Sequence, residues 1–240
     1  TSCGQLCFFR WCFENNILNE SNSLEQVLKI NSKRPVEIKR LESLKKIVRN
    51  NNFDNHISLG FSKIDNHETK EARYHYQKAE KIYPERLELK ALLEQILAEE
   101  KLYRTGQALK QAELAFSEDE VPIGAVIAAN HQIVGRGHNQ VEKLNDPTAH
   151  AEMIAITAAS SFLNSKYLNE CSIYVTGEPC VMCYGAIKNA RIKHIVLGCL
   201  EPKHGFTNFV SKPSSLELTS GVLEEESVRL MRSFFSSKRE

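Results

Sequence analysis

Two stretches decide the fold of this chain: His-Ala-Glu at residues 150–152 and Pro-Cys-Val-Met-Cys at residues 179–183. Each stands where a helix is expected to begin, and the proline of the second stretch suits the start of a helix. Cys180 and Cys183 fall three residues apart on the first turn, so their sulfurs share one face. Two helix starts can therefore bring the imidazole of His150 and two thiols together.

The residues around these stretches alternate between strand-like and helical patterns. Apolar runs predict strands at 123–128, around 133–134 after a turn at 130–131, at 172–176 and at 194–198. Apolar spacing predicts helices over about 109–116, from 150, from 180 and over about 223–236, with a loop at 138–149. Asp146 and Thr148 in that loop can cap the helix that opens at His150. This order predicts the α/β class, as a sandwich with a mixed sheet between helices.

The first hundred residues follow a different pattern, which divides the chain into expected domains 1–102 and 103–240. Apolar residues at helical spacing predict helices over about 36–49, 68–82 and 85–101. No repeat of fixed length is found, and no chemistry can be inferred from this part. We interpret residues 1–102 as a helical extension that packs on a partner or on the second domain.

Composition excludes several classes of protein. Hydrophobic residues make up 42% and charged residues 25% of the 240 positions, and the formal net charge is +1. These values are ordinary for a globular protein and give no overall positive field for nucleic acid, although a local patch would be enough. The sequence contains no run of about 18 apolar residues, so it predicts no membrane span. Seven cysteines, an odd number, argue against a disulfide framework and favour a reducing cytoplasm.

The residue types of the two stretches suit a hydrolytic metal site. A catalytic zinc ion takes three protein ligands and keeps a fourth position for water, and His150, Cys180 and Cys183 can supply the three. The positive end of a helix dipole favours the thiolate form of such cysteines. Glu152 can take a proton from the water and pass it to a departing amino group. His-x-Glu followed by Pro-Cys-x-x-Cys is the known signature of zinc-dependent nucleobase deaminases.

Each half of this signature has other interpretations. His-x-Glu alone is a weak pattern, and Cys-x-x-Cys alone occurs in redox pairs and in structural zinc sites. A structural site needs a fourth protein ligand, for which Cys171 and Cys199 are candidates. Both of these cysteines fall in predicted strands, where buried packing explains them better. The joint pattern, in this order of elements, favours a catalytic zinc site.

Residues 103–240 resemble the bacterial tRNA-specific adenosine deaminases of the cytidine deaminase superfamily. The matching stretches are EVPIGAV at 120–126, DPTAHAE at 146–152, EPCVMC at 178–183 and FFSSKR at 234–239. The resemblance implies a cytidine-deaminase-like three-layer α/β/α sandwich, one Zn2+ per deaminase domain and a homodimer. It implies a cytoplasmic enzyme that converts the wobble adenosine (A34) in a tRNA anticodon stem-loop to inosine.

The same resemblance assigns roles to single residues. His150, Cys180 and Cys183 would hold zinc, and Glu152 would carry the proton. Substrate contacts would come from Asn139, Ala151, Glu201, Lys203, Phe235, Lys238 and Arg239. Simpler interpretations stay open. Asn139 can be a turn residue, Lys203 a solvated lysine, and the C-terminal segment a helix that buries Phe234 and ends in exposed, frayed charged residues.

The chain departs from the family pattern at three positions. Gly177 stands where an apolar residue such as leucine is usual, which removes packing beside the zinc motif. Glu201 replaces an aspartate in the loop that faces RNA, and Leu200 stands where a basic residue can occur. These changes put the substrate preference of the loop in question.

Two other functions compete with deamination of tRNA. A deaminase of free guanine, cytosine or a nucleoside could use the same metal site, although a free base needs no Phe-Phe-x-x-Lys-Arg tail. A non-catalytic RNA-binding subunit could use the N-terminal helices, but such a subunit has no need of Glu152.

Overall fold

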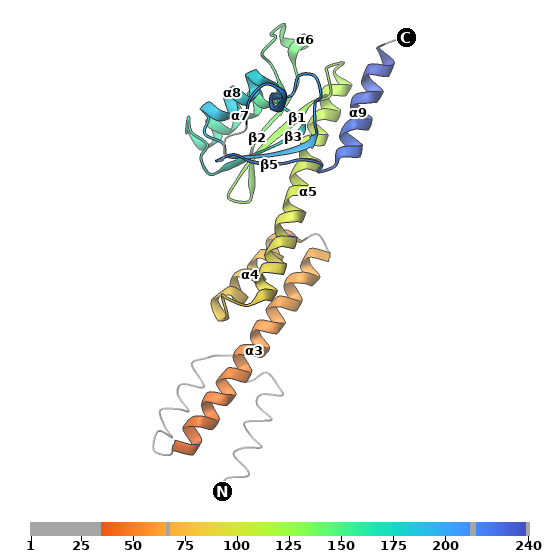
Figure 1. The fold of residues 1–240 in the computed structure, drawn as a ribbon. Coiled ribbons are helices and arrows are strands. Elements are labelled where there is room, and N and C mark those ends of the chain that lie inside the picture. The colour runs from red at the N-terminus through yellow and green to blue at the C-terminus, as the bar shows by residue number, and fades with distance from the viewer. Residues whose placement is uncertain (1–34, 66–67, 212–214, 239–240) are drawn as a thin grey trace. The chain divides into compact units, whose positions relative to one another are not determined.

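The computed structural model describes residues 35–65, 68–211 and 215–238 (Figure 1). The chain divides into two compact units, one that ends at Leu93 and one that runs from Glu94 to Glu240. This division falls inside helix α5 (Leu87–Ser117). The domain boundary that the sequence places at residue 102 stays a prediction.

The first unit contains helices in its described part. Helix α3 (Pro35–Asp65) continues sixteen residues beyond the predicted end at 49, through the asparagines at 50–52, and helix α4 (Thr69–Ile82) matches the predicted segment. The buried faces of α3, α4 and the beginning of α5 form a core of Phe53, Ile57, Ile64, Ala72, Ala79, Leu89 and Leu92. Because buried apolar side chains hold this core together, tertiary packing extends α3 where asparagines lower the intrinsic helix propensity.

The second unit contains a mixed sheet, as the sequence predicts, with five strands where the sequence indicated four. Its strands are β1 (Gly124–Ala129), β2 (Gln132–His138), β3 (Cys171–Gly177), β4 (His194–Cys199) and β5 (Glu217–Thr219). Their order is β2-β1-β3-β4-β5. Strand β1 pairs antiparallel with β2 and β3, whereas β3–β4 and β4–β5 pairs are parallel. The three-residue strand β5 is too short to give a sequence signal.

Helices cover both faces of this sheet, which confirms the three-layer sandwich (Figure 1). Helices α7 (Ala151–Leu163) and α8 (Val181–Asn189) pack on one face, and the C-terminal part of α5 and α9 (Glu224–Ser237) lie on the other. Alternate strand residues supply the two cores, since side chains of a strand point to opposite faces. The face under α7 and α8 receives Ala125, Ile127, Ile173, Val175, Ile195 and Leu197. The opposite face receives Val126, Ala128, Tyr174 and Val196, with Ala108 of α5.

Two further elements differ from the expectations. The segments predicted as separate helices at 85–101 and 109–116 form the single helix α5, because small buried residues at 105, 108 and 112 continue its packed face. The predicted loop at 138–149 contains a short helix, α6 (Val141–Leu144), which ends at Asn145 in the left-handed conformation.

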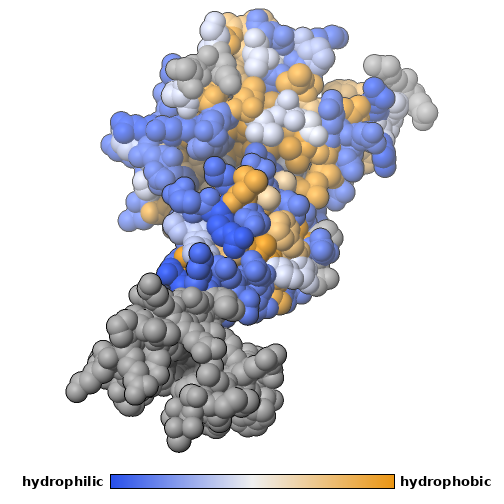
Figure 2. Space-filling view, turned by 60° about the horizontal axis from the view of Figure 1, so that its bottom comes forward, coloured by the Kyte–Doolittle hydropathy of each residue, from blue (hydrophilic) through white to orange (hydrophobic). Residues whose placement is uncertain are grey.

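The surface is mixed in character. Figure 2 shows hydrophobic residues in patches between hydrophilic ones on the visible face. Within the described residues, every helix is too short or too polar to span a bilayer.

Candidate active site

The His, Cys and Cys side chains of the two sequence stretches meet at the starts of two helices. His150 is the N-cap residue of α7, Cys180 is the N-cap residue of α8, and Cys183 lies in the first turn of α8. The Nδ1 atom of His150 lies 3.7 Å from Sγ of Cys180 and 3.4 Å from Sγ of Cys183. Each of the three residues has one ligand atom within 4.8 Å of the other two. In the described part of the chain, this is the one cluster of such residues that could hold a metal ion.

Close backbone packing places the first of these helices. A Cβ atom on Gly137 in β2 would lie 2.2 Å from the carbonyl oxygen of Ala151, so only glycine lets the start of α7 approach the strand this closely. The prediction that Asp146 or Thr148 caps this helix is wrong, because the N-cap residue of α7 is His150 and the helix start has no side-chain cap hydrogen bond. Instead, the carboxylate of Asp146 accepts hydrogen bonds from the backbone N–H (2.8 Å) and the hydroxyl (2.7 Å) of Thr148. These bonds fold the loop before α7, because Asp and Thr side chains often bond to nearby groups of their own loop instead of to the helix.

Glu152 lies beside the cluster with its carboxylate buried. Its side chain is 3% exposed, and Oε2 has no hydrogen-bond partner. Burial raises the pKa of Glu152, which makes the carboxyl a better proton acceptor than an exposed one. A buried carboxylate oxygen without a partner is costly unless a bound group satisfies it. Its position next to the imidazole and thiols therefore fits a site that is completed by a ligand.

The electrostatics of the cluster favour a cation. Hydrogen bonds with Cys183 and His150 lower the pKa of Cys180 to about 3, so this sulfur is a thiolate. The hydrogen bond with Cys180 and burial raise the pKa of Cys183, because two adjacent sulfurs share one proton. The pKa of His150 is raised, chiefly by its hydrogen bond with Cys180. An imidazole and two sulfur donors form a preferred ligand set for zinc, so the residues present fit a zinc ion with one open position.

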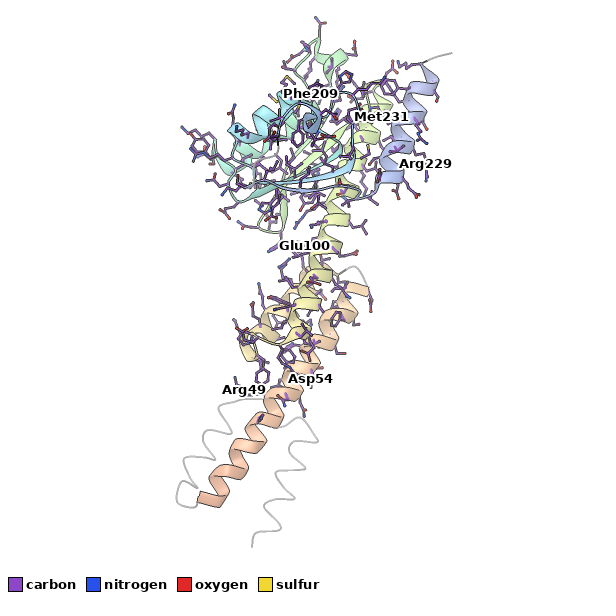
Figure 3. All side chains as sticks on the ribbon, in the orientation of Figure 1. Arg49, Asp54, Glu100, Phe209, Arg229 and Met231 are labelled. Carbon is purple, nitrogen blue, oxygen red and sulfur yellow. The ribbon has the colours of Figure 1, made fainter. Side chains whose placement is uncertain are left out.

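The cluster opens into a broad hollow of about 1300 Å³ in the second unit. This volume exceeds the roughly 300–1,000 Å³ of typical small-molecule pockets. His150, Glu152 and Cys180 contribute to its lining, and so do residues of α9. Met231 of α9 lines the hollow, whereas Arg229 on the same helix is exposed (Figure 3).

The predicted substrate contacts fall into three groups. Asn139, Glu201, Phe235 and Lys238 line the hollow. Ala151 is fully buried under the start of α7, and Lys203 is exposed, and neither lines the hollow. Arg239 lies outside the described residues. The structure thus brings four of the seven predicted contacts to the hollow that holds the cluster.

The four lining residues differ in what they contact. The side-chain amide of Asn139 donates to Glu120 at 3.0 Å, and the ammonium of Lys238 contacts Asp119 at 2.6 Å. Glu201 accepts the backbone N–H of Lys203 at 3.0 Å, so its carboxylate stays within its own loop. Phe235 is 45% exposed and is free to contact a ligand with its ring.

Several residues of the hollow were not singled out from the sequence, among them Glu120, Glu178 and His204. Both oxygens of Glu178 accept backbone N–H groups, from Glu201 at 3.1 Å and from Thr207 at 2.9 Å. Glu178 therefore holds the loop after β4 against the zinc motif. The sequence signal that could have identified Glu178 is its position between a predicted buried strand and Pro179, because a carboxylate buried there needs hydrogen-bond donors.

The two remaining strand cysteines lie outside the cluster. Cys171 begins β3 and is buried, and Cys199 ends β4, where its thiol lies 3.4 Å from the carbonyl oxygen of Thr176. Neither belongs to the described group of metal-ligand side chains. A four-ligand structural site with one of them therefore has no geometric support.

Comparisons with known proteins agree with this site. Residues 98–199 match the family model of the cytidine and deoxycytidylate deaminase zinc-binding region. The chain is 43% identical over 143 residues to a tRNA-specific adenosine deaminase of Rickettsia bellii, a match that covers 56% of this chain and 99% of that protein. It is 50% identical over 98 residues to the enzyme of the same description from Aquifex aeolicus, which covers 41% of this chain and 65% of that protein.

A solved structure gives the same result for the fold. It comes from work on A-to-I editing by tRNA:A34 deaminases at the wobble position of transfer RNA. It is 38% identical to this chain, with a TM-score of 0.51, and the match covers 53% of this chain and 98% of the other. The match therefore extends over about half of this chain and nearly all of the other.

Proposed function

The chain belongs to the family of tRNA-specific adenosine deaminases, and we propose that it hydrolyses the wobble adenosine of a tRNA anticodon to inosine and ammonia. One observation carries the proposal: the buried carboxylate of Glu152 lies beside His150, Cys180 and Cys183, in a hollow with room for more than a single base. Adenosine takes up one water and loses its 6-amino group: the water oxygen goes to C6, one water hydrogen to ring N1 and the other to the departing amine, so the site must move two protons.

Within the zinc-binding deaminase region, we assign His150, Cys180 and Cys183 as the residues that hold the zinc ion. When bound, zinc acts as a Lewis acid that makes water nucleophilic near neutral pH. The two helix starts direct their positive dipole ends toward the sulfurs, which stabilises their thiolate forms.

Glu152 is the proposed proton carrier. It accepts the two protons of the attacking water in turn and delivers one to ring N1 and the other to the 6-amino group, which leaves as ammonia. Its raised pKa suits both steps, because a carboxyl with a pKa closer to neutrality both accepts and releases a proton readily. The packed surroundings of Glu152 keep bulk water from competing for these protons.

The remaining predicted contacts belong to substrate binding. We propose that Asn139 contacts the purine and that Phe235 and Lys238 contact bases and phosphates of the anticodon loop; all three line the hollow, which supports these roles. A base in a single-stranded loop enters such a site at low cost, since it has no partner strand to leave. Glu201, Lys203, Ala151 and Arg239 stay assigned to the substrate by family resemblance alone.

We further propose a cytoplasmic homodimer. Val181 and Met182 lie between the two cysteine ligands on α8, and they are 44% and 37% exposed. Apolar side chains in such a position are suited to contact with a second subunit. Size-exclusion chromatography with light scattering tests this: a monomeric mass at micromolar concentration would contradict it.

The decisive experiment measures inosine in an anticodon stem-loop that carries A34, incubated with the zinc-loaded full chain. We expect conversion by the unaltered protein and a loss of about 10²–10⁴-fold in rate with Glu152→Gln, which keeps the volume of the side chain but removes the proton acceptor. Zinc content should be equal in the two proteins. Ammonia release from guanine, cytosine or free nucleosides, with no inosine in the RNA, would overturn the tRNA assignment.

A further inference from the structure

Glu120 is a buried carboxylate that contacts Asn139, the residue predicted to bind the purine. It follows the end of α5 and is 1% exposed. Its Oε2 accepts a hydrogen bond from Nδ2 of Asn139 at 3.0 Å. Its Oε1 accepts one from the backbone N–H of Lys143 at 2.7 Å. Both oxygens therefore face hydrogen-bond donors. The donor on Oε1 is a backbone N–H, which can never act as an acceptor.

This arrangement fixes the orientation of the Asn139 amide. A carboxylate that faces two donors only accepts, so the amide must turn its nitrogen toward Glu120. The amide group is planar, and its carbonyl oxygen is consequently held away from Glu120. Asn139 is 6% exposed, and its backbone N–H donates to the carbonyl oxygen of Ile123 at 3.0 Å, so the residue has little freedom to move.

We propose that Glu120 is a positioning residue that sets the hydrogen-bonding polarity of Asn139 toward the base. The inference rests on the proposed function and adds a determinant of base selectivity to it. With nitrogen directed to Glu120, the carbonyl Oδ1 is the acceptor available to the substrate. Adenine carries a 6-amino donor beside its ring acceptors, and an acceptor fixed on the protein selects for that donor.

The isosteric substitution Glu120→Gln tests this directly. The oxygen of the new side chain must take the fixed N–H of Lys143, so its nitrogen faces Asn139. The Asn139 amide must then turn over to accept, which directs its own nitrogen to the substrate. Volume and both hydrogen bonds are retained, so we expect an unchanged melting temperature and zinc content. We expect kcat/KM for the A34 stem-loop to fall about 10- to 100-fold, as for a mispaired buried polar group.

A second substitution should restore activity. In the Glu120→Gln background, Asn139→Asp accepts from the new amide with one oxygen and offers the other as an acceptor to the base. This double variant exchanges the two groups without changing their shapes or the net charge. We expect its kcat/KM to return to within about threefold of the unaltered protein, as expected when the same hydrogen bonds are made. If the single variant does not fold, the double variant still decides the question.

Two controls separate positioning from a general structural effect. Glu100→Gln removes the charge of another buried carboxylate that does not line the hollow, and it should leave kcat/KM unchanged. Affinity for a stem-loop with no base at position 34 should be the same for Glu120→Gln and the unaltered protein, because the contacts outside the base are intact.

The outcomes distinguish this inference from the proposed function. Full activity of Glu120→Gln, or a folded double variant without recovery, overturns the polarity role of Glu120. Failure of the unaltered protein to convert A34 overturns the proposed function instead. Loss of activity in the single variant with recovery in the double variant supports both.

Discussion

The ammonium of Lys238, which follows α9, lies 2.6 Å from the carboxylate of Asp119, which follows α5. The two side chains are 44% and 77% exposed, and ion pairs of this kind contribute about 0–1 kcal/mol to stability. The same lysine lines the proposed RNA-binding hollow. Asp119 therefore holds Lys238 at the rim of the hollow, where a phosphate can replace the carboxylate.

We expect Lys238→Ala to change RNA binding more than stability. Loss of one phosphate contact should lower the slope of log affinity against log salt by about 0.7 for single-stranded RNA. The free energy of unfolding should fall by less than about 1 kcal/mol. Fluorescence titrations of the stem-loop at several salt concentrations give the slope. A slope equal to that of the unaltered protein would show that Lys238 stays with Asp119 in the complex.

The two neighbouring phenylalanines of α9 should separate packing from binding. Phe234 is 6% exposed and makes an edge contact with Phe116 of α5, so Phe234→Ala should lower the free energy of unfolding by about 3 kcal/mol. Phe235 is 45% exposed, so Phe235→Ala should cost far less stability but weaken RNA binding by about 1–3 kcal/mol if a base stacks on it. Urea unfolding and stem-loop titration of both variants check this. Equal losses of stability would contradict the assignment.

Removal of a ligand should release the metal without unfolding the sheet. His150→Ala should reduce zinc from one ion per chain to near zero and lower the melting temperature, because zinc stabilises only the folded state. The apolar core under α7 and α8 does not include His150, so the far-UV circular dichroism should persist. Cys171→Ala is the matched control and should retain zinc. Metal analysis that finds a full zinc content in His150→Ala would reject the ligand assignment.

Gly177 leaves space that a methyl group can occupy. A Cβ atom there would meet only Cδ1 of Ile123, at 3.0 Å, which is the movable end of a side chain. Gly177→Ala should therefore be neutral or stabilise the protein by up to about 1 kcal/mol, because alanine restricts the unfolded chain. Gly135→Ala is the contrasting control, since its Cβ would lie 2.5 Å from the carbonyl oxygen of Ala155, and it should destabilise. Chemical denaturation compares them, and a strongly destabilised Gly177→Ala would contradict this account.

The sequence predicted the elements whose signals are local. Pro179 and the apolar runs on either side of it indicated a strand followed by a helix, and the structure contains both β3 and α8. The motif also indicated that His150, Glu152 and the two cysteines would be neighbours, and the structure brings them together, while their roles stay predictions.

What the sequence did not predict depends on contacts between distant residues. The partnership of Glu120 with Asn139 and the loop contacts of Glu178 arise from folding: the place of Glu178 before Pro179 could indicate burial, but not which donors its carboxylate meets. The union of two predicted helices into α5 follows from small buried residues that a spacing rule does not weight. Resemblance indicated Lys203 as the contact in its loop, yet the neighbouring His204 lines the hollow and Lys203 does not.

The separation of the ligands along the chain has a consequence during protein synthesis. His150 precedes α7, and the cysteines stand thirty and thirty-three positions later, after β3 has crossed to pair with β1. A growing polypeptide therefore presents no complete ligand set until Cys183 has left the ribosome. At that point β1, β2 and β3 have emerged, whereas β4 and β5 have not, so the ligand set is complete in the emerged chain before the sheet is.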